Sequence, residues 1–311
     1  MPFERATSRP ASKPWGSNDL RPWNSVENPA VIGELVFDRI YPHTLDPSLL
    51  LKLLFTTQDL SIQVHPDDAF AQSVGMPNGK TEAWYVLSAA EGAQVAIGLK
   101  QSMTQIELRD AIADGSIADF VNWQPASVGD VFYVQAGTIH AIGSGLVIAE
   151  IQQRSDTTFR LFDHGRTREL HIDQALAVAN LEPTKAQPTP TNITVERMQL
   201  TSCPFFTFER LDLPPDATWE LRVGCEAWAV VIGGDATIGA MRAGLGDVFF
   251  ANEDRAVVKV GRDGVAILLA YADSVPDPDL LRELDDGFAT NRPIEQERPV
   301  VLPFRAMEQS L

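Results

Sequence analysis

An internal repeat constrains the fold of this chain more than any other feature of its sequence. One pair of similar segments is TEAWYVLSAAEGAQVAIG (81–98) and CEAWAVVIGGDATIG (225–239). A second pair, in the same order, is GDVFYVQAGTIH (129–140) and GDVFFANEDRAV (246–257). Each copy carries a Gly-Asp turn directly before a β-rich run, and a repeated unit of this kind indicates a repeated architecture. The alternative is chance similarity between β-rich segments. The shared order favours two small β-barrels or jelly rolls in one chain.

The first copy holds extra residues between its two segments, and these have a helical pattern. MTQIELRDAIADGSIADFVNW (103–123) contains Thr104 followed by Glu107, the spacing of a capping box, and a rough apolar stripe. We therefore expect a small helical insertion at about 101–124. HIDQALAVANL (171–181) has apolar residues at i, i+3, i+4 and i+7, which predicts a second helix.

These patterns predict a mainly β protein with four parts. Residues 1–181 form the first β domain, with the helical insertion and the candidate metal-binding and catalytic residues. EPTKAQPTPTN (182–192) is polar and carries three prolines, which indicates a linker. Residues 193–273 form a degenerate second barrel. The remaining segment, 274–311, is acidic and contains prolines, and no role is assigned to it.

The two copies differ at the positions where chemistry is expected. His140 ends the second segment of the first copy, and Val257 stands in its place in the second copy. Glu82 has a counterpart in Glu226, but no histidine occurs after His171. This difference fits a duplicated barrel in which one copy keeps a metal and the other has become a scaffold.

A glutamine and a histidine lie two residues apart in LSIQVHPDD (60–68). In a strand, Gln63 and His65 project to the same face, either as a hydrogen-bonded pair at a barrel mouth or as metal ligands. Together with Glu82 and His140 they supply two imidazoles, one carboxylate and one amide oxygen. Zn²⁺, Fe²⁺ and Mn²⁺ accept such ligands. The set contains no thiolate, which argues against a closed structural zinc site and for an open, catalytic one.

Charge limits the classes of partner. The net charge of −17 makes nucleic acid and anionic membranes poor partners, and an anionic small substrate needs a local basic patch. Four arginines after the first copy supply a candidate patch, although such residues also form ordinary solvated faces. They are Arg154, Arg160, Arg166 and Arg168.

The remaining composition indicates a cytoplasmic protein. No apolar run approaches the length of a membrane span, and the N-terminal MPFERATSRPASK lacks the apolar core of a secretory signal. Two cysteines, Cys203 and Cys225, do not make a disulfide framework, which fits a reducing compartment.

Several motifs together resemble a known enzyme family. GDVFYVQAGTIH is similar to the second motif of the cupin superfamily, with Gln135 in place of the usual proline. Five motifs in order resemble the short bacterial form of type I phosphomannose isomerase, also called mannose-6-phosphate isomerase. They are KPWGS, QVHPDD, GKTEAWYVL, AGTIHAIGSG and EIQQRSDTTFRLFDHGR. The resemblance covers about residues 13–181 and extends loosely to the second barrel. Arg154 departs from it, because the short form usually has asparagine there.

The resemblance implies a site and a reaction. It implies one Zn²⁺ per chain, with other divalent ions as alternatives, held by Gln63, His65, Glu82 and His140. It also implies catalytic roles for Arg160, Lys80 and Glu150. The implied reaction interconverts mannose 6-phosphate and fructose 6-phosphate through an enediol.

Several assignments stay open at this point. Lys80 serves either proton transfer or phosphate binding, and Arg160 is alternatively a surface ion-pair partner of Asp163. The alternative functions are isomerisation of another aldose or of an unphosphorylated sugar, and sugar binding by a non-catalytic regulatory cupin. The oligomeric state is open.

Overall fold

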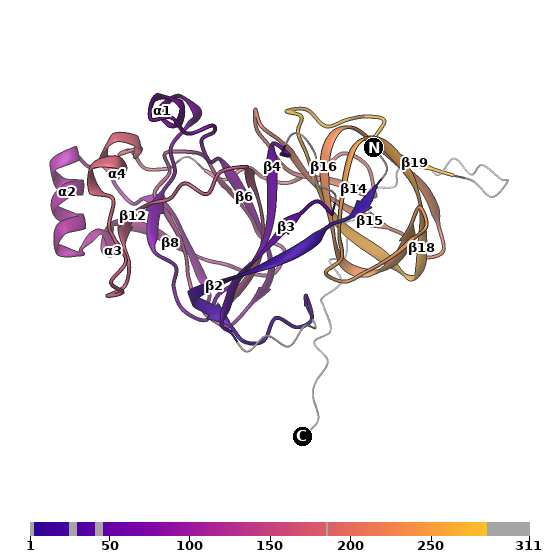
Figure 1. The fold of residues 1–311 in the computed structure, drawn as a ribbon, viewed down its shortest axis with the longest axis horizontal. Coiled ribbons are helices and arrows are strands. Elements are labelled where there is room, and N and C mark those ends of the chain that lie inside the picture. The colour runs from indigo at the N-terminus through magenta and orange to yellow at the C-terminus, as the bar shows by residue number, and fades with distance from the viewer. Residues whose placement is uncertain (1–2, 25–29, 41–45, 185, 285–311) are drawn as a thin grey trace, which may run out of the picture.

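The computed structural model describes residues 3–24, 30–40, 46–184 and 186–284, and strands dominate this part of the chain (Figure 1). The named strands pair antiparallel and form three sheets. This confirms the prediction of a mainly β protein. None of the helices in the described part of the chain has the length and hydropathy of a transmembrane segment.

The first repeat builds two sheets that pack face to face. The six-stranded sheet contains β2 (Thr7–Ser17), β3 (Ile32–Asp38), β4 (Leu49–Phe55), β6 (Glu82–Ala89), β9 (Val131–Val134) and β11 (Leu146–Gln153). Its strand order is β2-β3-β4-β11-β6-β9. The five-stranded sheet contains β5 (Ile62–Val64), β7 (Gln94–Leu99), β8 (Val121–Pro125), β10 (His140–Ile142) and β12 (Phe159–Phe162), in the order β12-β5-β10-β7-β8. Apolar side chains from both sheets, including Trp84 of β6 and Val95 of β7, form one buried cluster between them. This arrangement follows from strands that alternate inward and outward side chains.

The second repeat builds the third sheet, which has eight strands. Its strands are β1 (Glu4–Arg5), β13 (Thr191–Asn192), β14 (Arg197–Ser202), β15 (Thr207–Leu213), β16 (Thr218–Ile238), β17 (Met241–Gly244), β18 (Val248–Tyr271) and β19 (Leu281–Glu283). The long strands β16 and β18 pair along much of their lengths, with several register shifts that let the sheet curve.

Three segments near the expected boundaries join this third sheet. β1, at the N-terminal end of the expected first domain, pairs with β18. β13 lies within the expected linker, and β19 lies within the segment 274–311 and pairs with β16. Residues 285–311 of the expected tail lie outside the described residues. We propose that the chain divides into its two halves within 182–190.

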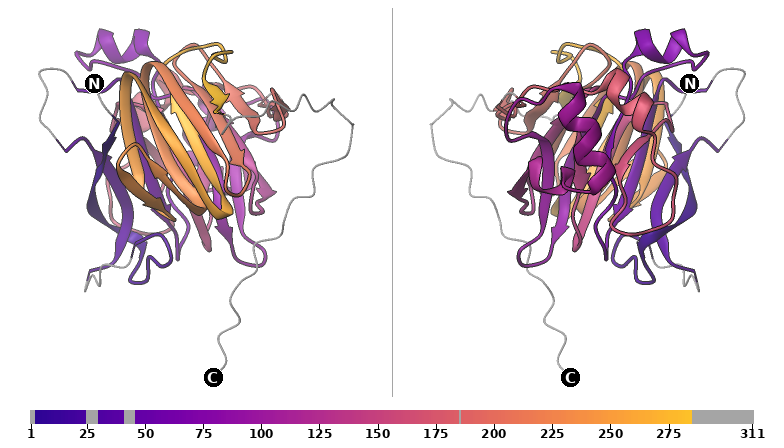
Figure 2. Two further views of the ribbon diagram at one scale, coloured as in Figure 1. Left: turned by 90° about the vertical axis from the view of Figure 1, so that its right-hand side faces the viewer. Right: turned by 90° about the vertical axis from the view of Figure 1, so that its left-hand side faces the viewer.

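Four helices lie on the first-repeat side of the described structure, away from the eight-stranded sheet (Figure 1). They are α1 (Asp68–Ser73), α2 (Gln105–Asp114), α3 (Ile117–Phe120) and α4 (Ile172–Val178). The right-hand view of Figure 2 looks onto this helical end. α4 confirms the helix predicted within 171–181. α1 was not predicted, although Asp67 is its N-cap and accepts a hydrogen bond from the Phe70 N–H.

The insertion is helical as predicted, but it is shorter than 103–123. The capping box at the start of α2 is present in full, because Thr104 and Glu107 each accept from the other's backbone N–H. α2 ends at Asp114, and the next residue, Gly115, has the left-handed φ of +82° that terminates many helices. After the short helix α3, the residues from Val121 onward form β8 and pair with β7. The prediction of helix for 121–123 was therefore wrong: pairing with a neighbouring strand overrides the local periodicity.

One buried cluster joins the two repeats. Leu49, Leu51, Leu53 and Phe55 of β4 pack in the same cluster as Trp228 of β16 and Phe250 of β18. Burying a side chain of this size stabilises a fold by roughly 1.5–3 kcal/mol. The cluster therefore fixes β4 against the second repeat, while the other face of β4 turns toward the interior of the first.

Candidate metal centre and adjoining cavity

Three predicted ligands, His65, Glu82 and His140, converge inside the first repeat. His65 follows β5 directly, Glu82 begins β6 and His140 begins β10. The two Glu82 carboxylate oxygens lie 3.6 Å from His65 Nε2 and 3.5 Å from His140 Nε2. All three side chains are at most 1% exposed, and one ligand atom from each lies within 4.8 Å of the others. In the described part of the chain, no other group of three His, Cys, Asp or Glu residues is arranged in this way.

Both imidazoles are oriented by backbone carbonyls. His65 Nδ1 lies 2.8 Å from the Thr157 carbonyl oxygen, and His140 Nδ1 lies 2.8 Å from the Thr138 carbonyl oxygen. A carbonyl oxygen only accepts, so Nδ1 carries the proton in each ring and the Nε2 lone pair faces Glu82. Burial lowers the pKa of His140 to about 4, and burial together with the Lys80 ammonium lowers the pKa of His65. Both rings are thus neutral and correctly oriented to bind a metal.

The chemistry of this group fits a divalent cation. Neither Glu82 oxygen accepts a hydrogen bond of regular geometry, although the Lys80 ammonium lies 2.9 Å from Oε2. The same ammonium lies 3.3 Å from His65 Nε2. Glu82 Oε1 is buried and has no donor of this kind, which is costly, and a cation held between the carboxylate and the two imidazoles would offset that cost. Two nitrogen ligands, one carboxylate and no thiolate are a set that Zn²⁺ and similar ions accept.

Gln63 lies beside this triad, as the sequence predicted. Gln63 on β5 lies opposite His140 on β10 in the strand pairing, and Gln63 Nε2 lies 3.3 Å from His140 Nε2. Its Oε1 accepts a hydrogen bond from the Ser61 hydroxyl at 3.1 Å. A half-turn of the terminal amide would exchange these two atoms and present the oxygen to the triad. Its role as a fourth ligand stays a prediction.

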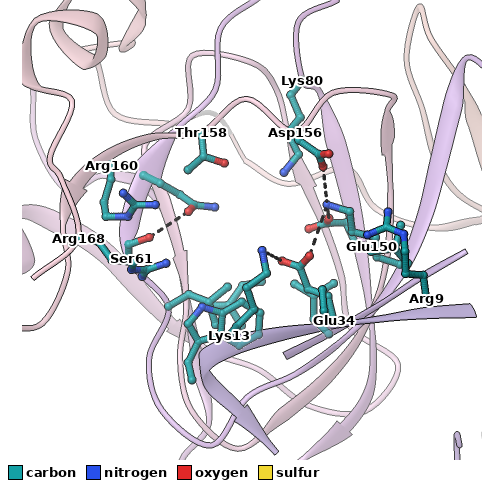
Figure 3. A pocket seen from close by; sticks show the side chains of 18 residues that line it. Arg9, Lys13, Glu34, Ser61, Lys80, Glu150, Asp156, Thr158, Arg160 and Arg168 are labelled. Atoms are coloured by element: carbon teal, nitrogen blue, oxygen red, sulfur yellow. Dashed lines mark hydrogen bonds and ion pairs between the residues drawn. The ribbon is translucent and has the colours of Figure 1, made fainter. Parts of the chain in front are cut away.

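Gln63 and Lys80, which lie beside the triad, also line a cavity of about 400 Å³ (Figure 3). Its charged lining residues are Arg9, Lys13, Glu34, Lys52, Lys80, Glu150, Asp156, Arg160 and Arg168. Cationic side chains outnumber carboxylates in this lining, although the whole chain carries a net charge of −17. The cavity therefore has the local positive charge that an anionic ligand needs.

Glu150 is held at the wall of the cavity by two groups. Trp84 Nε1 donates to Glu150 Oε2 at 3.2 Å, and Lys52 Nζ lies 4.0 Å from Oε1. Burial, reinforced by the Glu82 charge, raises the pKa of Glu150 to about 7 despite the nearby lysines. A carboxyl group with such a pKa gains and loses a proton near neutral pH. Burial alone would lower the pKa of Lys80, but the Glu82 and Glu150 carboxylates raise it above its usual value, so Lys80 is positively charged.

Arg160 faces the cavity from β12. The alternative in which it pairs with Asp163 is not what the structure shows, because Arg166 and Arg168 both bind that carboxylate. Arg160 Nη1 instead donates to the Glu169 carbonyl oxygen at 2.7 Å. Among the four arginines of the expected basic patch, Arg160 and Arg168 line the cavity. Arg166 binds Asp163, and Arg154 lies 4.0 Å from Asp38 outside this lining.

Sequence reasoning missed five charged residues of the cavity: Arg9, Lys13, Glu34, Lys52 and Asp156. Lys52 lies 3.4 Å from Asp156 and 3.9 Å from Glu34, and Lys13 lies 3.2 Å from Glu34. One signal was available, since Lys52 is a charged residue inside the apolar run LLLKLLF (49–55). A charge at such a position needs a buried partner.

Comparison with known proteins bears on this site. No family model matches the chain. A mannose-6-phosphate isomerase of Streptococcus mutans is 44% identical over 167 residues, which cover 51% of this chain and 52% of that protein. The mannose-6-phosphate isomerase ManA of Bacillus subtilis is 34% identical over 180 residues, which cover 55% and 57%. The chain therefore matches about half the length of these curated relatives.

Solved structures extend the likeness to most of the fold. A crystal structure of the mannose 6-phosphate isomerase from Bacillus subtilis aligns with a TM-score of 0.77 at 22% identity, covering 87% of this chain and 100% of that one. The apo form of the enzyme from Salmonella typhimurium aligns with a TM-score of 0.69 at 15% identity, covering 88% and 100%. The chain is similar to the mannose-6-phosphate isomerases. These findings confirm the resemblance noted in the motifs.

Proposed function

We propose that this protein is a metal-dependent aldose–ketose isomerase that interconverts mannose 6-phosphate and fructose 6-phosphate. The observation that carries the proposal is the buried triad His65, Glu82 and His140 beside a cavity with excess positive charge. Two curated relatives, 44% and 34% identical to this chain over about half of its length, carry the name of this activity. We further propose a cytoplasmic location, since both cysteines are free thiols.

In this proposal the triad, with Gln63 as fourth ligand, holds one Zn²⁺ or a similar ion. When bound, such an ion supplies Lewis-acid stabilisation of the oxygen that becomes negatively charged in the enediol. The protein side chains perform the remaining tasks. Arg168 and the other cationic side chains at the cavity wall attract the phosphate-bearing substrate.

We assign proton transfer between the two adjacent carbons to Glu150. It lines the cavity, its orientation is fixed by Trp84, and its pKa is about 7. Proton transfer by a positioned group contributes about 10²–10⁴ in rate. The guanidinium of Arg160 adds stabilisation where negative charge develops, and the Lys80 ammonium balances the Glu82 and Glu150 carboxylates.

A coupled isomerase assay tests the proposal. Purified protein is assayed on mannose 6-phosphate, glucose 6-phosphate and free mannose, each with and without added Zn²⁺. We expect rapid turnover of mannose 6-phosphate that depends on the metal. Turnover of free mannose alone would show that the cavity serves an unphosphorylated sugar. Binding of mannose 6-phosphate without turnover would indicate a regulatory binding protein instead.

A further inference from the structure

Glu226 is the counterpart of the triad residue Glu82 in the second repeat, and its carboxylate has a different set of partners. Its Oε2 accepts from the Ser48 N–H at 2.6 Å and from the Ser48 hydroxyl at 2.9 Å. Its Oε1 accepts from the Leu49 N–H at 2.8 Å and from Trp228 Nε1 at 3.3 Å. Three of these four donors belong to the first repeat. The carboxylate thus joins the two repeats.

The donors lie at the start of β4, a strand that serves both the contact between the repeats and the cavity. The side chains of Leu49, Leu51 and Leu53 pack in the cluster shared with the second repeat. The alternate side chains of Lys52 and Leu54 line the cavity. Since β4 is tightly paired and buried, a shift at its first residues is carried along the strand to Lys52.

The same few residues also fix the segment that carries Asp156. The Arg154 N–H donates to the Ser48 carbonyl oxygen at 2.8 Å, and Leu49 lies opposite Gln153 in the β4–β11 pairing. Asp156 follows two residues later and lies 3.4 Å from Lys52 Nζ. Glu226 therefore binds the start of β4, which carries Lys52, and this same start binds the segment that carries Asp156.

We infer that Glu226 is a positioning residue for the cavity: it anchors the start of β4 and thereby sets the place of the Lys52 ammonium. The second repeat, in which Val257 stands where His140 stands in the first, thus contributes to the site through this carboxylate. The kinetic part of the inference rests on the proposed isomerase function. The structural part, which concerns the backbone at 48–49, does not.

A double-mutant cycle between Glu226 and Lys52 tests the inference. In Glu226→Gln one carboxylate oxygen becomes an amide NH2 group, which cannot accept a hydrogen bond. The backbone N–H of either Ser48 or Leu49 therefore loses its acceptor. We expect kcat/KM for mannose 6-phosphate to fall about tenfold, mainly through a higher KM, because coupled neighbours interact by this order of magnitude. In the Lys52→Met background the same change should cost less than about twofold. Metal content should stay at the level of the parent protein.

Two further measurements exclude a general loss of stability. Glu220→Gln alters a carboxylate of the same strand, β16, that pairs with Arg282 and not with β4, and it should leave kcat and KM unchanged. Hydrogen exchange of Glu226→Gln should show faster exchange at the Ser48, Leu49 and Arg154 amides of the first repeat, with the amides of the second repeat as in the parent.

The outcomes separate the two proposals. Additive losses in the cycle, or a fall in kcat alone in proportion to the folded fraction, would overturn the positioning role. Unchanged exchange at 48–49 would also overturn it, whatever the enzyme activity. If the parent isomerises no sugar, the proposed function fails, and selective loss of protection at 48–49 still supports the anchor.

Discussion

Trp84 donates a hydrogen bond from its indole Nε1 to Oε2 of Glu150, at 3.2 Å, inside the first repeat. Both side chains are buried, and the Trp84 indole also packs edge-on against the His140 imidazole, with ring centroids 5.6 Å apart. One tryptophan therefore orients the proposed proton carrier and contacts a proposed metal ligand. The corresponding Trp228 donates to Glu226 within its own Glu-Ala-Trp, whereas Trp84 donates to Glu150 of the neighbouring strand.

Replacing Trp84 by phenylalanine should remove this orientation while keeping most of the packing. Because Glu150 loses a donor, we expect kcat/KM to fall about tenfold and the free energy of unfolding to fall by about 1–2 kcal/mol. Steady-state kinetics and chemical denaturation measure the two effects. Trp219→Phe is the matched control, since the Trp219 indole nitrogen is buried without a hydrogen-bond partner and has none to lose. Equal kinetic losses in both variants would contradict the assigned role of Trp84.

Removal of either histidine of the triad should remove the metal. His65→Ala and His140→Ala each take away a neutral imidazole oriented by a backbone carbonyl, so we expect metal content well below one ion per chain and loss of isomerase activity. Elemental analysis of dialysed protein measures the first effect. Chelation of the parent should also abolish activity, and added Zn²⁺ should restore it.

His164→Ala is the control for these variants. The His164 ring lies 2.8 Å from the Leu60 carbonyl oxygen and is not part of the triad, so metal content should stay at the parent level. Full activity in thoroughly metal-free parent protein would show that the triad is not a catalytic metal centre.

The sequence predicted the kind of site better than its surroundings. His65, Glu82 and His140 were identifiable because their residue types are unusual in apolar strands and because Val257 breaks the pattern in the second copy. Lys52 and Glu34 were missed, since their meeting depends on the pairing of β3 with β4 and of β4 with β11, which no local pattern encodes. The same holds for Glu226: its sequence context shows a lost ligand, and its contact with Ser48 arises between segments far apart in the chain.

Substitutions of Arg160 distinguish a catalytic role of this residue from a role in substrate binding. If its guanidinium stabilises charge that develops in the transition state, Arg160→Ala should lower kcat and kcat/KM alike, by about 10²-fold or about 3 kcal/mol of barrier. Arg160→Lys keeps the charge but loses the planar set of donors, so it should restore activity in part. Metal content should not change, because arginine is not a ligand.

Kinetics on Arg109→Ala provide the comparison, since Arg109 forms an exposed ion pair with Asp173 on the helical side of the molecule. That variant should match the parent. If Arg160→Ala raised KM alone, Arg160 would bind the phosphate group in ground and transition states equally, and the catalytic role would belong to Glu150 and Lys80.

The pH dependence of kcat/KM should report the ionisation of Glu150. Its pKa is raised to about 7 by burial and by Glu82, and a general base must be deprotonated to act. We therefore expect kcat/KM for mannose 6-phosphate to be low below this pH and to rise through an apparent pKa near 7.

The Lys52 ammonium favours the ionised carboxylate and lowers the pKa of Glu150, so Lys52→Met should move the midpoint to higher pH. Lys13→Met is the matched control: it removes a second cationic side chain of the same cavity, one that lies 3.2 Å from Glu34. It should weaken substrate binding and leave the midpoint close to that of the parent. A profile that is flat between pH 5 and 8, or a midpoint that moves to lower pH in Lys52→Met, would assign the proton transfer to a group other than Glu150.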